Sequence, residues 1–226
     1  VAATEPASTF KELAKARLGD AANTREAYAA HRALLREYGV GKLRAELVSA
    51  GLVDGEGKLT TGTKPFNLFA RIAAGAMAQP EMAEANAALG EAAARYVVCC
   101  NRKENDEHWQ SDEPEWVGKA SMAQRHRFLT TRDLRWERFN CLTFGLGGGD
   151  ELREAIAFLE DMLATANAWA AAPSSEAEGW SAASLGCFFH VYPHNSVQSL
   201  HLHLVDLAAV GPTYAHLAHK NMPAAD

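Results

Sequence analysis

The chain has 226 residues, of which 48% are hydrophobic and 22% charged, and its formal net charge is −6. A chain of this length and composition can bury a real core, which excludes a disordered or fibrous protein. The acidic balance argues against a duplex nucleic-acid partner, which needs a basic face, and no apolar run approaches the roughly 18 residues that cross a bilayer.

Helical patterning dominates the first part of the chain. Leucine and alanine recur among lysine, arginine and glutamate over residues 8–50, and breakers are scarce. The glycine-rich stretch 51–62 predicts a turn or short hairpin, after which helical patterning resumes over 66–78 and 80–94. Because no catalytic motif stands out here, we interpret residues 1–90 as a helical packing or cap region.

The composition changes near residue 91, where β-rich runs begin. Five short runs predict strands over residues 95–100, 128–131, 139–144, 185–192 and 199–207. The order of strands, one long helix and two more strands predicts an α+β fold with a mostly antiparallel sheet over residues 91–226.

The connections between these strands have their own signals. The charge-dense segment 101–115 predicts a solvated loop, and the small residues of 170–184 predict another. Asp150 is expected to cap the long helix. The inner face of that helix is predicted to hold Leu152, Ile156, Leu159, Leu163 and Ala166.

The four cysteines bear on the compartment. Cys99, Cys100, Cys141 and Cys187 contain no Cys-x-x-Cys ligand pair, and adjacent cysteines are awkward partners for a disulfide. The N-terminal residues lack the basic and apolar segments of a secretory signal. We therefore expect reduced thiols in a cytoplasmic protein.

A glycine-rich stretch, Gly145–Asp150, stands before the long helix. Its spacing matches neither of the two glycine-rich phosphate-binding templates. A carboxylate at the start of the helix would also repel an anion at the place where it should bind. We interpret the stretch as a flexible turn.

The most specific pattern lies at residues 193–206, where polar and aliphatic residues alternate. A period of two predicts a strand with Ser199, His201 and His203 on one face. The three leucines between and after them, at positions 200, 202 and 204, would seal a core on the other face. Two neighbouring imidazoles on a rigid strand favour an active site over a core.

Metal binding is one interpretation of these histidines. His190, His194, His201 and His203 fall within fourteen residues. Zinc, however, needs three or four oriented ligands, often with a carboxylate or thiolate among them. Asp206 has the opposite strand parity, so we expect neither a metal nor an organic cofactor.

Nucleophilic catalysis by histidine is the alternative that we favour. A neutral imidazole can attack a phosphorus, expel a leaving group and form a phospho-histidine that water cleaves. Neighbouring donors on the strand can hold the non-bridging oxygens. A hydroxyl before the strand can assist the leaving atom.

The segment resembles the histidine triad superfamily, most closely its aprataxin-like and scavenger decapping-like branch. There a Pro-x-x-Ser turn runs into a His-φ-His-φ-His-φ-φ strand, which here reads Pro193–Gln198 followed by Ser199–Val205. The resemblance implies a HIT-like antiparallel sheet. By position it implies that His201 is the nucleophile, His203 a phosphate contact and Ser196 the leaving-group hydroxyl.

Ser199 replaces the first histidine of the triad, which in the family mainly supports and orients the site. An alternative register makes His203 the nucleophile and His201 the first histidine, but it loses the match of Ser196. Both registers stay open at this stage, and the first fits more of the motif.

The resemblance also implies substrate contacts in addition to His201, His203 and Ser196. Further substrate-binding candidates are Ser199, His190, His126, Gln198 and Asn195. Near the end of the chain, His216, His219 and Lys220 could reach a phosphate, but we expect a solvated segment there.

As the resemblance implies, the protein would be a hydrolase that cleaves a small nucleotide conjugate at its α-phosphorus through a nucleotidyl-histidine. The bond would be a phosphoanhydride, phosphoester or phosphoramidate. Nucleotidyl transfer to a second substrate, a weakly catalytic nucleotide sensor and a metal-dependent enzyme are the alternatives. Family members often dimerise, so a homodimer is a further expectation.

Overall fold

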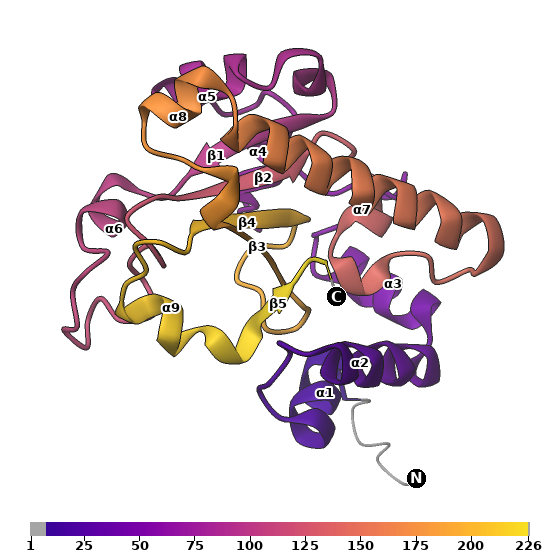
Figure 1. Ribbon diagram of the computed structural model, residues 1–226. Coiled ribbons are helices and arrows are strands. Elements are labelled where there is room, and N and C mark those ends of the chain that lie inside the picture. Colours follow the sequence, from indigo (N-terminus) through magenta and orange to yellow (C-terminus); the bar gives the residue numbers. More distant parts are fainter. Residues whose placement is uncertain (1–7, 226) are drawn as a thin grey trace, which may run out of the picture.

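The computed structural model describes residues 8–225 and has an α+β fold built on a five-stranded sheet (Figure 1). The strands are β1 (Tyr96–Cys100), β2 (His126–Thr131), β3 (Leu185–His190), β4 (His201–Asp206) and β5 (Asn221–Pro223). Their order is β1-β2-β4-β3-β5, and every neighbouring pair is antiparallel. The strands predicted over 95–100, 128–131, 185–192 and 199–207 are thereby confirmed with small shifts of their ends.

The helices of the described residues surround this sheet. They are α1 (Phe10–Leu18), α2 (Arg25–Tyr38), α3 (Val40–Ser49), α4 (Leu68–Ala73), α5 (Ala83–Ala87), α6 (Lys103–Glu107), α7 (Gly149–Ala170), α8 (Pro173–Ala177) and α9 (Pro212–His216). The predicted helical region 8–50 is confirmed as α1 to α3. The glycine-rich stretch after it forms a single bridge between Val53 and Leu59, as expected of a turn or short hairpin.

Alternation along β4 divides the sheet into two faces. The leucine face contains Leu202 and Leu204, which are both fully buried in the main core. The histidine face contains His201 and His203, and Phe128 of β2 and Phe188 of β3 both lie opposite His203 in the register. The central position of β4 therefore places both imidazoles in the middle of the sheet.

The long helix α7 covers the leucine face. Met162, Ala166 and Trp169 of its second half are buried in the same cluster as Leu202. The cluster also includes Phe10 of α1, so the first helices share this core. The boundary predicted near residue 90 stays a prediction.

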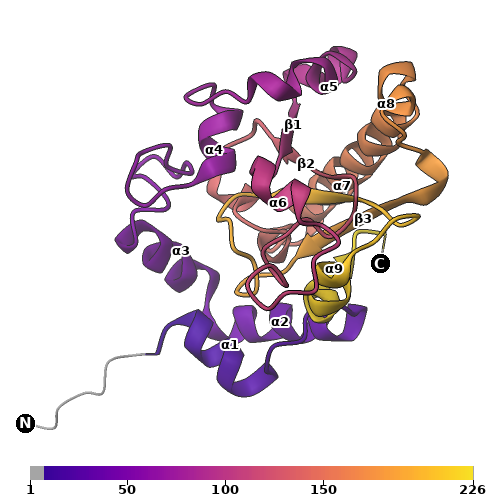
Figure 2. The same cartoon turned by 90° about the vertical axis from the view of Figure 1, so that its left-hand side faces the viewer.

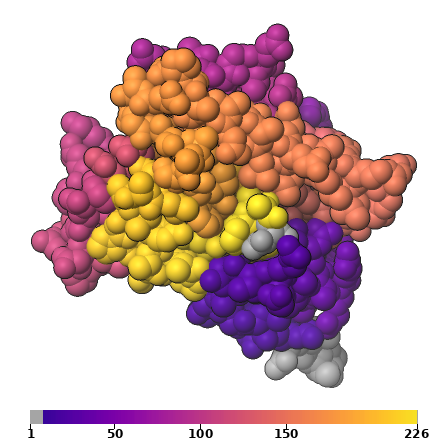
Figure 3. Space-filling view, in the orientation of Figure 1, coloured from indigo at the N-terminus to yellow at the C-terminus, as the bar shows by residue number. Residues whose placement is uncertain are grey.

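The helix α4 packs on the opposite, histidine face. Phe69 and Ile72 form a smaller buried cluster with Val97 of β1 and Phe128 of β2. Figure 2 shows α3 and α4 along one flank of the molecule, with α1 and α2 beneath it. In Figure 3 the first helices lie beside the C-terminal segment, where the amide of Ala22 donates to the carbonyl of His219 at 2.8 Å.

The structure corrects the prediction of a strand over 139–144. A 3₁₀ turn spans Cys141–Thr143, because the side chain of Asn140 accepts the amide of Leu142 and caps it. Asparagine side chains compete in this way with the ladder of a sheet. The segments predicted as helices over 66–78 and 80–94 contain only short helices.

The loops predicted over 101–115 and 170–184 are also corrected in part, since they contain α6 and α8. Pro173 is the first residue of α8, a position that suits proline because no amide is needed there. The four cysteines are free thiols, as expected.

The long helix is confirmed, but two details of its prediction are wrong. It begins at Gly149, so Asp150 lies in its first turn and Gly148 takes the capping position. Leu152 and Ile156 are 44% and 49% exposed, because the first half of the helix extends past the sheet (Figure 1). No helix within residues 8–225 is both long and apolar enough to span a bilayer.

Candidate functional site

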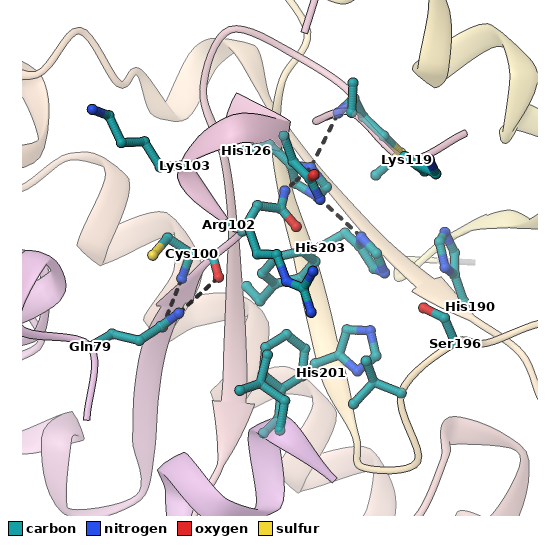
Figure 4. Close-up of a pocket in the computed structure, with 18 of the residues that line it drawn as sticks. Gln79, Cys100, Arg102, Lys103, Lys119, His126, His190, Ser196, His201 and His203 are labelled. Carbon is teal, nitrogen blue, oxygen red and sulfur yellow. Dashed lines mark hydrogen bonds between the residues drawn. The ribbon is translucent and has the colours of Figure 1, made fainter. Parts of the chain in front are cut away.

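A cavity of about 510 Å³ opens on the histidine face of the sheet (Figure 4). This volume lies within the usual range for small-molecule sites. His126, His190, His201, His203 and Ser196 line it together. The structure thus brings five of the predicted site residues into one space.

The loop that joins β3 to β4 is held at both of its ends. The side chain of Asn140 donates through Nδ2 to the carbonyl of His190 at 2.9 Å, and its Oδ1 accepts the backbone amide of Tyr192 at 2.9 Å. At the other end, Asn67 donates to the carbonyl of Gln198 at 2.8 Å. Ser196 lies between these two clamps, so its place at the cavity is set by residues distant in the sequence.

The hydrogen bonds of His201 fix its tautomer. Its Nδ1 lies 2.7 Å from the carbonyl of Ser199, which can only accept, so Nδ1 carries the proton. Burial lowers the pKa of His201 to about 4, against the hydrogen bond to Ser199, which raises it. The ring packs edge-on against Phe69 at 4.8 Å. Nε2 of a neutral His201 therefore keeps a lone pair that can attack an electrophile or take a proton.

His203 has the opposite tautomer, set by a chain of donors. The amide of Met122 and the side chain of Asn101 both donate to Nδ1 of His126, each at 3.2 Å. Nε2 of His126 then carries the proton and donates to Nδ1 of His203 at 3.1 Å. Nε2–H of His203 remains as a buried donor without a partner in residues 8–225. Such a group is costly unless a ligand accepts its proton.

His190 completes the group of imidazoles. Its ring lies 3.9 Å from that of His203, centroid to centroid, and its Nε2 donates to the side chain of Asn221 at 2.8 Å. Burial lowers the pKa of both His190 and His126 to about 3. The four imidazoles at the cavity are consequently neutral near pH 7.

Ser196 is exposed and faces the same space. Figure 4 shows it between His190 and His201. Its hydroxyl has no hydrogen-bond partner within the described chain, so it can bind a ligand atom.

Three predicted substrate contacts lie outside the cavity. The side chains of Asn195 and Gln198 bond each other at 3.3 Å and brace the loop. Ser199 is 1% exposed, and its hydroxyl has no partner in the described part of the structure. Its backbone carbonyl, rather than its side chain, orients His201.

The remaining histidines lie outside the cavity. His194 faces His31 of α2, with 3.2 Å between their Nε2 atoms. His216 and His219 are exposed, as expected of a solvated segment. Lys220 instead lines the cavity, and its ammonium lies 3.4 Å from the carbonyl of His194.

Two groups of residues that line the cavity were not predicted from the sequence. Phe66, Phe69 and Met77 come from the region interpreted as packing, and Arg102 comes from the segment predicted as a solvated loop. The only sequence feature that could have indicated either group is the basic pair at 102–103. Nothing local in the sequence shows that either segment reaches the histidine face.

Within residues 8–225 no group of three or more histidine, cysteine or carboxylate side chains is arranged to hold a metal ion. Four imidazoles meet at the cavity, but one nitrogen of His126 and one of His203 are hydrogen-bonded to each other.

Comparison with known proteins found no matching family model, no matching curated protein and no matching solved structure.

Proposed function

We propose that the protein is a histidine-triad-like nucleotide hydrolase that cleaves a nucleotide conjugate at its α-phosphorus. The observation that carries this proposal is the opposite protonation of two neighbouring imidazoles. His201 presents a lone pair at Nε2, and His203 presents an N–H at the same atom. A nucleophile beside a donor is the arrangement that attack on a phosphate requires.

The reaction has two balanced steps. Nε2 of His201 attacks the α-phosphorus, and the bond to the leaving oxygen or nitrogen breaks with its electrons on that atom. Ser196 donates a hydrogen bond to the leaving atom, and a leaving amine also takes up a proton from solvent. The charge of the imidazolium is steadied by the carbonyl of Ser199 at Nδ1. Water then attacks the phosphorus, loses a proton to solvent and releases the nucleoside monophosphate, which restores neutral His201.

Nucleotidyl transfer is the second candidate, since an acceptor hydroxyl or phosphate could replace water in the second step. The third candidate is a binding protein with little turnover, because Ser199 replaces the first histidine of the triad motif. The N–H of His203 has no partner among residues 8–225, and this supports ligand binding in all three cases.

The test uses adenosine phosphoramidate with a fluorogenic amine and a dinucleoside polyphosphate. We expect His201→Ala to lower kcat by a factor on the order of a thousand or more, as loss of a nucleophile does in other covalent enzymes. Mass spectrometry at neutral pH should find a nucleotidyl adduct on His201 of the wild type. His194→Ala is the matched control, because His194 does not line the cavity.

Equal rates for the wild type and His201→Ala would reject His201 as the nucleophile. An adduct on His203 would select the other register. Binding of nucleotide without any turnover would favour the sensor.

A further inference from the structure

A network of hydrogen bonds continues outward from the histidines to a carboxylate on α6. Asn101 donates through Nδ2 to Nδ1 of His126 at 3.2 Å and to Oγ of Ser121 at 2.7 Å. The hydroxyl of Ser121 donates in turn to one carboxylate oxygen of Asp106. The other carboxylate oxygen of Asp106 lies 3.0 Å from Nη1 of Arg127. We call Asp106, Ser121 and Asn101 the outer network.

The direction of the protons is fixed at the outer end of this network. The carboxylate of Asp106, which forms an ion pair with Arg127, can only accept hydrogen bonds. The hydroxyl proton of Ser121 must therefore point at Asp106. Oγ of Ser121 then has only lone pairs to offer Asn101, so Nδ2 of Asn101 faces it and Oδ1 does not.

The inner end of the network requires the same orientation of Asn101. Nδ1 of His126 also accepts the backbone amide of Met122 at 3.2 Å, and because an amide N–H only donates, this nitrogen has no proton. An amide oxygen of Asn101 in the same place would face a lone pair. The proton of His126 is consequently on Nε2 and is donated to His203, as the dashed line between them in Figure 4 shows.

Two members of the outer network have no direct access to a ligand in the histidine cavity. Neither Ser121 nor Asp106 lines that cavity. Ser121 is fully buried, and its backbone amide is held by the carbonyl of Asn105 at 2.9 Å. Asp106 and Arg127 line a separate cavity of about 470 Å³, and Asn101 lines both. Asp106 and Ser121 therefore contact the imidazoles only by way of Asn101.

We propose that Asn101 is a positioning residue, oriented by Asp106 through Ser121, that keeps the N–H of His203 directed into the cavity. If Asn101 presented its oxygen instead, His126 would need its proton on Nδ1. Nε2 of His126 would then accept from Nδ1 of His203, and Nε2 of His203 would present a lone pair to the phosphate. The expected effect on rate rests on the proposed function, whereas the positions of the protons do not.

Long-range proton–nitrogen NMR of the histidine rings at neutral pH tests the proton positions in the wild type. We expect Nδ1 to be unprotonated and Nε2 protonated in both His126 and His203. His201 is the internal reference, because its bond to the carbonyl of Ser199 requires the opposite pattern. A proton on Nδ1 of His126 or His203 would overturn the proposal, whether or not any variant folds.

Asn101→Asp places an acceptor at both contacts of the side chain. We expect Nδ1 of His126 to become protonated in the NMR spectrum. The kcat for the fluorogenic adenosine phosphoramidate should fall about a hundredfold, as it does when an enzyme loses a donor to a developing oxyanion. An Asn101→Asp variant in which Nδ1 of His126 stays unprotonated would overturn the proposal.

Asp106→Asn tests the outer end, where an amide can donate as well as accept and no longer fixes the proton of Ser121. We expect kcat to fall about threefold to tenfold, the contribution of one hydrogen bond. This variant removes a negative charge, whereas Asn101→Asp adds one. An effect of charge alone would move kcat in opposite directions in the two variants, and that result would overturn the proposal.

The matched control is Asn167→Asp, the same substitution at an exposed site on α7. It should leave both the histidine resonances and kcat as in the wild type. If the wild type shows no turnover, the proposed function fails, and the NMR pattern of the wild type and of Asn101→Asp decides the role of Asn101 by itself.

Discussion

Leu202 and His203 are neighbours on one strand, yet they lie on opposite faces of the sheet and in opposite kinds of surroundings. Leu202 is fully buried among apolar groups of the main core. His203 is also buried, but it lies among three other imidazoles, and its Nε2 has no partner in residues 8–225. Burial of Leu202 stabilises the fold, whereas burial of His203 costs free energy that a ligand can recover.

The largest expected difference between the two faces of the sheet is in how acid affects their contribution to stability. The folded pKa values of His201 and His126 are about 4 and 3, below the ordinary value of 6.5. The unfolded chain therefore binds more protons below about pH 6.5, and stability falls as the pH drops from there toward 4. Each imidazole contributes up to about 1.4 kcal/mol per pH unit in this window. Leu202 and Leu204 of the leucine face have no titratable group and contribute no such dependence.

Urea unfolding at pH 7 and pH 5 measures this loss. His126→Asn should reduce the pH dependence by close to one proton, because one buried imidazole is gone. His216→Asn is the matched control, since His216 is exposed. If both variants keep the slope of the wild type, the histidine face does not carry the acid sensitivity.

The second prediction concerns the leucine face. Leu202→Ala should lower the free energy of unfolding by about 2–5 kcal/mol, because the side chain leaves a cavity in a packed core. The folded fraction should keep the kcat of the wild type, since Leu202 points away from the histidines. His203→Ala should show the reverse, with a large loss of kcat and a small change in the urea midpoint. Loss of kcat in Leu202→Ala at full folding would show that the two faces are coupled.

Local pattern was enough to predict one of the two faces but not what covers it. Alternation with a period of two predicts β4 and separates His201 from Leu202, because strand geometry is local. It does not predict that residues 66–81 and 101–119 reach the histidines. That placement depends on distant contacts, such as the bond from Gly118 to Thr213.

Two predictions from the sequence were wrong for similar physical reasons. Asn140 turned a predicted strand into a 3₁₀ turn, because its side chain captured a backbone amide. Ile156 fits the amphipathic pattern of α7 but is exposed, because the helix is longer than the surface it covers. Both outcomes depend on competition and length in three dimensions.

The smallest expected effect concerns Ser199, the residue that departs from the triad motif. It lies on the same face of the alternating pattern as His201 and His203, so the pattern alone predicts a loss of activity when its side chain is removed. Its hydroxyl, however, is buried without a partner in the described structure, and its carbonyl is what holds His201. Ser199→Ala keeps that carbonyl.

We therefore expect Ser199→Ala to change kcat/KM by less than about threefold and the free energy of unfolding by less than about 1 kcal/mol, in the stabilising direction. Ser196→Ala is the matched control, because it removes a hydroxyl that does line the cavity. Loss of leaving-group assistance should slow it by about a hundredfold. If Ser199→Ala were as slow as Ser196→Ala, the side chain at the first triad position would act directly on His201. The difference between the two faces of β4 would then extend two residues before the strand.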